Sequence, residues 1–198
     1  MITQSTQFGD IGSESVNELA RMFWHCAILR AGIKLEVFSI LDKNGMTYDE
    51  LAESIGASPR YVSAFLDSCV VLGLLEQSDD KYHNSPLTSR TLIRGKPEYV
   101  GDHALHHTNT WASWGRLDEV IKEGKILLPF ETGYVDTATY WTNYMMDQHN
   151  RATSRQADQL VGNVDLSGKR KLLDLGGGSG SYSIALCDTN PGSECGGH

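Results

Sequence analysis

The chain has 198 residues, of which 40% are hydrophobic and 21% are charged, which is typical of a folded globular protein and excludes a disordered one. Its formal net charge is -8, from 17 Lys and Arg against 25 Asp and Glu, so negatively charged nucleic acids and membrane surfaces are disfavoured as partners. The polar N-terminus has no signal-peptide pattern, and no apolar run approaches the roughly 18 residues of a membrane span. We therefore expect no nucleic-acid partner and no membrane association.

The first third of the chain predicts helices with defined ends. Apolar residues recur with helical period from Ser13 to Leu41, with a break after Gly32. Thr47 and Glu50 form a capping-box pattern that opens a helix over Tyr48–Ile55, which Gly56 ends.

A third helical segment and a hairpin follow. Ser58 is expected to cap a helix that begins with Pro59 and continues to Leu72. Strand-like runs at 74–77 and 81–84, joined by a polar turn, predict a hairpin. Two helices followed by a hairpin, in this order, indicate a winged helix.

Winged helices often bind DNA, but the charges argue against it here. Between Asp42 and Tyr82 there are three basic residues and eight acidic ones, and the would-be recognition helix offers Arg60 as its only basic residue. Reading a major groove and neutralising phosphates both require Arg and Lys. The first helix instead suggests a subunit interface, because its apolar residues extend beyond one core-facing stripe: Leu19, Met22, Phe23, Trp24 and Ile28.

The middle of the chain predicts two long helices and then a change of pattern. The helices cover 97–124 and 137–161, with a loop at 129–136 between them. The apolar run Lys169–Leu175 predicts a buried parallel strand, and Ser181–Cys187 predicts the start of a helix. Strand, glycine turn and helix form the first half of a β-α-β unit. The tail from Pro191 to His198 has no periodicity.

The glycine turn between that strand and helix is the most informative motif. It reads Asp-Leu-Gly-Gly-Gly-Ser-Gly from Asp174 to Gly180. Glycines allow a tight turn and let a ligand approach bare backbone amides at the helix N-terminus. A dinucleotide fingerprint would need its third glycine at position 181, which is Ser, and the Gly-Lys-Ser/Thr ending of a phosphate-binding P-loop is missing. A glycine-rich turn without a ligand is the plain alternative.

An acid just before Gly-x-Gly-x-Gly resembles the first motif of the S-adenosylmethionine-dependent methyltransferases. The whole chain is similar to the small-molecule O-methyltransferases that carry an N-terminal winged-helix dimerisation domain, through the winged helix, the helix Trp114-x-x-Leu117-x-x-Val120-x-x-Gly124 and the approach to the glycine loop. The resemblance implies a mainly α fold with three parts: a winged-helix dimerisation domain at 1–96, connecting helices at 97–164 and the start of a Rossmann-like α/β domain at 165–198.

The resemblance also implies the cofactor, the partners and the site residues. It implies S-adenosylmethionine as cofactor, a small-molecule hydroxyl acceptor and a homodimer through the N-terminal helices. The implied cofactor-binding residues are Asp174, Gly176, Gly177, Gly178 and Gly180, and the implied substrate-side residues are Met145, Met146 and His106.

The chain departs from this family after the glycine loop. The family places an acid at the end of a second strand about 20 residues past the loop, but no predicted strand precedes Glu194, which falls near that count. The family's catalytic histidine lies later still, so we expect no catalytic residue here and an incomplete, inactive chain. The open alternatives are a non-catalytic dimerisation module and, more distantly, a winged-helix transcriptional regulator.

Histidines and cysteines are the residues that could bind a metal ion. His103, His106 and His107 share one helical face, whereas the adjacent Asp102 points to another face. No metal site is predicted, and the histidines are interpreted as surface or pocket-lining residues. Cys195 and His198 supply two ligands where a structural zinc site needs four. No cysteines have C-x-x-C spacing, which favours a reducing, cytoplasmic compartment.

Overall fold

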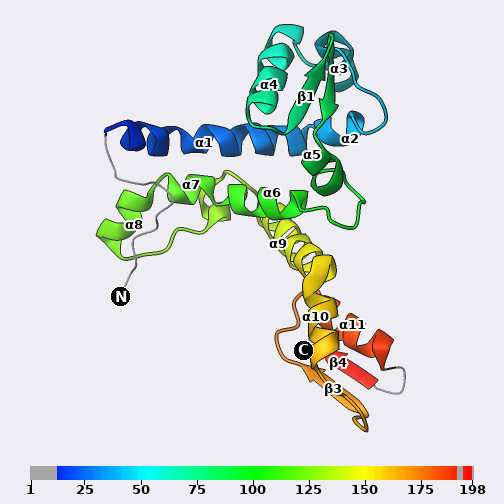
Figure 1. Ribbon diagram of the computed structural model, residues 1–198. Helices are drawn as coiled ribbons and strands as arrows, with labels where there is room; N and C mark the ends of the chain where they lie inside the picture. Colours follow the sequence, from blue (N-terminus) through cyan, green and yellow to red (C-terminus); the bar gives the residue numbers. More distant parts are fainter. Residues whose placement is uncertain (1–12, 191–193, 198) are drawn as a thin grey trace.

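The computed structural model describes residues 13–190 and 194–197, and within these ranges the protein is mainly helical (Figure 1). A long helix α1 (Ser13–Lys34) runs beside a small N-terminal unit. Three further helices, α6 (Gly101–Asn109), α7 (Trp111–Trp114) and α8 (Leu117–Glu123), follow one another below α1. Helix α9 (Thr137–Arg151) leads away from them to a small β-α-β unit at the end of the chain. The expectation of a mainly α protein is therefore confirmed.

The N-terminal unit is built around one hydrophobic core. Its elements after α1 are α2 (Val37–Ile40), α3 (Tyr48–Ile55), α4 (Pro59–Val71), the antiparallel strands β1 (Leu75–Ser78) and β2 (Lys81–Asn84), and α5 (Pro86–Thr91). The core residues that are almost inaccessible to solvent are Val37, Phe38, Leu51, Leu66, Cys69 and Leu75. The helix–helix–hairpin order predicted from the sequence is present, and α5 is an additional helix that the sequence did not indicate.

The two predicted helix starts behave differently. At α3 the backbone N–H of Glu50 donates to Thr47 Oγ1 at 3.2 Å, and the Glu50 carboxylate accepts from the Thr47 N–H at 2.8 Å, so the capping box is confirmed. These bonds lower the pKa of Glu50. At α4 Pro59 occupies the first turn as expected, but the Ser58 side chain makes no capping bond, so its predicted role is wrong.

The sequence predicted a break in the first helix after Gly32, but the helix continues through this residue. It continues to Lys34, and the chain turns at Glu36, whose φ of 54° lies in the left-handed region. Gly32 stays within the helix because the ring of Phe38 packs directly against it: a Cβ at position 32 would lie 2.5 Å from Phe38 Cζ. Here the glycine allows a close approach of α1 to the core and does not end the helix.

The prediction of one continuous helix over 97–124 is also wrong. The structure has three shorter helices, α6 (Gly101–Asn109), α7 (Trp111–Trp114) and α8 (Leu117–Glu123). The turn at 115–116 separates α7 from α8, and a 3₁₀ helix at Pro129–Thr132 follows within the predicted loop. The apolar residues keep a helical period across such short turns, because each interruption shifts the apolar face by only part of a turn. The sequence pattern therefore does not reveal the breaks.

The second long helix is confirmed with one local change. It consists of α9 (Thr137–Arg151), a π-helical turn at Ala152–Gln156 and α10 (Ala157–Asn163), joined without a loop. The Asp136 carboxylate caps it by accepting from the Thr139 N–H at 2.8 Å. A π turn inserts one extra residue and rotates the following helix face.

The end of the chain forms a β-α-β unit. Strand β3 (Lys171–Asp174), helix α11 (Ser181–Thr189) and strand β4 (Glu194–Gly197) follow in order, and β4 pairs with β3 in parallel. The tail has no periodicity in the sequence but forms a strand at 194–197, and Glu194 is the first residue of this strand. The rest of the tail, including His198, lies outside the described residues.

The cysteines of the described chain include free thiols and a disulfide-bonded residue. Cys26 and Cys69 are free thiols, and burial raises the pKa of Cys69 to about 12. Cys187 is disulfide-bonded, which the expectation of a reducing compartment did not anticipate. Among the described residues, no helix combines the length and apolarity needed to cross a membrane.

The contact between Gly32 and Phe38 gives a stability test. Gly32→Ala places a methyl group inside the van der Waals radius of a buried ring, so the free energy of unfolding is expected to fall by about 1–3 kcal/mol. The matched control is Gly162→Ala in α10, where a Cβ meets no atom within 4 Å; this change should leave stability unchanged or raise it by up to about 1 kcal/mol. Urea denaturation followed by circular dichroism measures both. Equal effects of the two substitutions would mean that Phe38 does not pack on α1.

Candidate functional site

The glycine loop joins the end of β3 to the start of α11. Gly176, Gly178 and Gly180 have φ angles of 73°, 57° and 71°. L-residues with a side chain rarely adopt these left-handed values, so the three alternate glycines are required by the turn itself. The turn leads into α11, whose first backbone N–H groups have no partner within the helix and face the loop.

Asp174 lies over this loop. The space where a Cβ of Gly177 would sit is occupied by the carboxylate, with Oδ2 at 2.7 Å from that position. The hydroxyl of Ser183 on α11 donates to the same oxygen. The five residues expected to bind a cofactor are therefore brought together in one turn, with the acid folded back toward the first turn of α11.

Helix α9 holds the glycine loop from the other side. His149 Nδ1 lies 2.8 Å from the hydroxyl oxygen of Ser181, the first residue of α11, and that oxygen lies 2.8 Å from Ser179 Oγ within the loop. The Tyr182 hydroxyl donates to Gln156 Oε1, in the π turn, at 2.5 Å. The contacts of His149 and Gln156 with α11 could not be predicted from the sequence, because their partners are 32 and 26 residues away.

A cavity of about 450 Å³ opens beside His149. Its wall combines α9 with the start of α6 and the segment before it, through Arg94, Tyr99, Asp102, Met146, His149 and Asn150. Asp102 is buried there; its carboxylate accepts from Asn150 Nδ2 at 3.0 Å and pairs with Arg94 at 3.6 Å. Polar groups and a methionine on one wall suit a small organic molecule.

The three residues expected on the substrate side lie in different surroundings. Met146 lines the cavity, whereas the neighbouring Met145 is about as exposed but turns to another side of the helix. His106 lies away from this wall, against the rings of Tyr140 and Tyr144, with centroids 5.6 Å and 5.1 Å away. Burial lowers the pKa of His106, and its Nδ1 atom is buried without a hydrogen-bond partner among the described residues.

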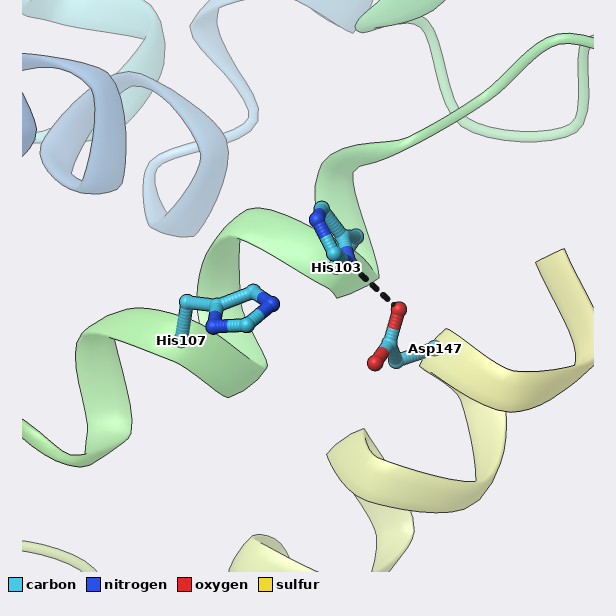
Figure 2. Close-up of side chains that lie close together, drawn as sticks. All are labelled: His103, His107 and Asp147. Atoms are coloured by element: carbon cyan, nitrogen blue, oxygen red, sulfur yellow. Dashed lines mark hydrogen bonds and ion pairs between the residues drawn. The ribbon is translucent and has the colours of Figure 1, made fainter. Parts of the chain in front are cut away.

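His103 and His107 meet a carboxylate that the sequence did not point to (Figure 2). His103 Nδ1 lies 2.6 Å from Oδ1 of Asp147, on α9, and the two imidazole rings are 4.3 Å apart between centroids. Asp147 is fully buried. Asp102, the acid next to the histidines in sequence, points elsewhere, as expected. Asp147 is 44 residues from His103, and its only signal in the sequence was that of an acid on a helix of mixed polarity.

The chain is similar to O-methyltransferases in its N-terminal part and along most of its length. Residues 17–94 match the family model of the O-methyltransferase dimerisation domain. The chain is 33% identical over 187 residues to the tetracenomycin polyketide synthesis 8-O-methyl transferase TcmO of Streptomyces glaucescens, covering 91% of this chain and 54% of that protein. It is 31% identical over 193 residues to acetylserotonin O-methyltransferase of Mus musculus, covering 89% of this chain and 50% of that protein.

Solved structures share the fold. Human N-acetylserotonin methyltransferase in complex with S-adenosylmethionine aligns with a TM-score of 0.79 at 23% identity, over 96% of this chain and 60% of that one. The mitomycin 7-O-methyltransferase MmcR aligns with a TM-score of 0.79 at 21% identity, over 93% and 57%. The chain spans about half the length of the curated relatives that it matches.

Proposed function

We propose, starting from the membership of residues 17–94 in the O-methyltransferase dimerisation domain family, that this chain contributes the dimerisation part and the first cofactor-binding loop of an S-adenosylmethionine-dependent O-methyltransferase. The relatives named above support the reaction class, and the glycine loop carries the argument for the cofactor. The acceptor in this proposal is a small molecule with a hydroxyl group.

The glycine loop suits a nucleoside that carries an amino acid. Bare backbone at Gly176, Gly178 and Gly180 allows a ligand to approach the main chain, and the N-terminus of α11 adds N–H donors. The carboxylate of Asp174 places one negative charge beside the loop, which favours a ligand with an ammonium group. S-Adenosylmethionine combines these features, and its sulfonium carries the methyl group to be transferred.

Methyl transfer needs positioning more than covalent help from the protein. An acceptor oxygen attacks the methyl carbon as the carbon–sulfur bond breaks, and the hydroxyl proton passes to a base. In the proposal the cavity beside Met146 and His149 contributes to the acceptor side, because His149 also contacts the first residue of α11. The general base is not assigned to any described residue.

Helix α1 is proposed as the homodimer surface. Its side chains Leu19, Met22, Phe23 and Trp24 are 43%, 43%, 54% and 53% exposed, although all are large and apolar. A contiguous apolar face of this kind on a helix is typical of an interface. The dimerisation domain that includes most of α1 supports the same assignment.

A cofactor-free dimerisation module is the second candidate function. The observation that favours it is the exposure of Leu173, Leu175 and Ile184, at 61%, 77% and 58%, on and around the β-α-β unit. A strand and helix with exposed apolar side chains hold their loop less firmly than a covered sheet does. The same dimer would then form without binding S-adenosylmethionine.

The cofactor proposal is tested by calorimetric titration of S-adenosylmethionine into the purified chain. Saturable binding is expected, and Gly176→Ala should weaken it roughly tenfold or more, because an alanine costs about 1–2 kcal/mol at a φ of 73° and adds a methyl group to the loop. Gly73→Ala is the matched control, since it imposes similar strain at a φ of 69° in the turn before β1 and should leave affinity unchanged. A wild-type chain that dimerises without binding would favour the module instead.

The interface proposal is tested by light scattering after size-exclusion chromatography. The wild-type chain should elute at twice its mass of 21.8 kDa, and Phe23→Glu should convert it to a monomer because a charge would be buried in the interface. Val71→Glu is the matched control: this apolar residue is 85% exposed at the end of α4 and lies off the proposed surface. A Phe23→Glu dimer would place the interface elsewhere.

A further inference from the structure

The buried carboxylate of Asp147 is only half satisfied. Its Oδ1 atom accepts from His103 Nδ1 at 2.6 Å and lies 3.4 Å from Arg151 Nε. Its Oδ2 atom is buried and has no hydrogen-bond partner among the described residues. A buried carboxylate oxygen without a partner is unfavourable, because it has lost its water without gaining a donor or a cation. This oxygen is therefore available to a ligand.

Two imidazoles stand beside the Asp147 carboxylate. His103 and His107 are four residues apart on α6, so their side chains lie on one face one turn apart. Figure 2 shows the Asp147 carboxylate on α9 facing both rings across the gap between the helices. One ligand atom from each of the three residues lies within 4.8 Å of the others.

We propose that His103, His107 and Asp147 form a binding site for a divalent transition-metal ion of the zinc type. Imidazole nitrogen and carboxylate oxygen are both zinc ligands, and two histidines at positions i and i+4 of a helix can bind one ion together. Ligand atoms around tetrahedral zinc are roughly 3.3 Å apart, given bonds of about 2.0–2.1 Å, so small side-chain rotations would close the observed spacing. The ion would replace the His103–Asp147 hydrogen bond, and any proton on the ligating nitrogen would leave to solvent.

The site has three protein ligands and an open side. Asp147 is fully buried and His103 is half-buried, but His107 is exposed, so the fourth coordination position faces solvent. A metal there would join α6 to α9. The residues next to its ligands, Asp102 and Met146, line the cavity described above, so the ion would also fix the distance between two walls of that cavity.

Among the contacts described for Asp147, that with Arg151 on α9 brings a positive charge, which disfavours a bound cation. Its guanidinium lies 3.4 Å from Asp147 Oδ1 and would repel a cation bound to the same carboxylate. Removing this charge should therefore strengthen metal binding, whereas removing a ligand should weaken it. The two directions separate a specific site from general attraction to an acidic protein.

The test is titration of Zn²⁺ into the purified full chain without a histidine tag, in a Cys26→Ser background because that free thiol is exposed. Binding of one ion per chain and a higher midpoint of thermal unfolding are expected. Co²⁺ should give the visible absorption of a tetrahedral site. His107→Ala, at an exposed position, should lower the affinity roughly tenfold or more, and His103→Ala should do the same. His25→Ala, an exposed histidine on α1, is the matched control and should change nothing.

Arg151→Gln completes the set and should raise the affinity. The proposal is overturned if the chain binds no Zn²⁺ at micromolar concentrations, or if the His107→Ala and His103→Ala variants, folded by circular dichroism, bind as the parent does. Neither result depends on S-adenosylmethionine binding, so the metal site and the proposed function can fail separately.

Discussion

The packing of α9 against α6 is the contact on which the other parts of the site depend. Along this interface the two helices bring together residues far apart in sequence: Asp147 meets His103, and Asn150 meets Asp102. Beyond the interface, the C-terminal end of α9 holds the glycine loop through His149 and Ser181. One helix thus positions both the wall of the cavity and the loop proposed to bind the cofactor. A change that rotated α9 would move both together, since close-packed interiors transmit displacements.

Polar contacts join the N-terminal unit to this interface. Arg30 of α1 donates to the hydroxyl of Thr108 on α6 at 2.6 Å, and its guanidinium lies over the ring of Tyr134, 5.3 Å from the centroid. These contacts come from the half of α1 beyond its exposed apolar residues. The first part of α1 is therefore free to form the proposed dimer contact, while the second part fixes the position of α6. The proposed dimer surface and the contacts to α6 therefore lie on one helix.

The candidate site was predictable from the sequence only where it is local. The glycine loop and Asp174 were found because their spacing is itself the structural requirement: alternate positive φ angles need alternate glycines. Asp147 was missed because nothing in a sequence tells which acid on one helix faces a histidine on another. Met145 and Met146 could not be separated for a related reason, since neighbouring residues on a helix point about 100° apart and only packing decides which one faces the cavity.

The sequence alone determined the features that close within a few residues. The capping box of Thr47 and Glu50, the turn at Gly56 and the glycine loop depend on hydrogen bonds and backbone angles of adjacent residues, and they are where the sequence placed them. Tertiary structure decided that Gly32 stays helical against Phe38, that the helix over 97–124 divides in three and that residues 194–197 pair with β3. The strand at 194–197 needs β3 as its partner, 23 residues earlier in the chain, and the ring on Gly32 comes from the next helix. Local propensity is too weak to decide how helices divide and pack.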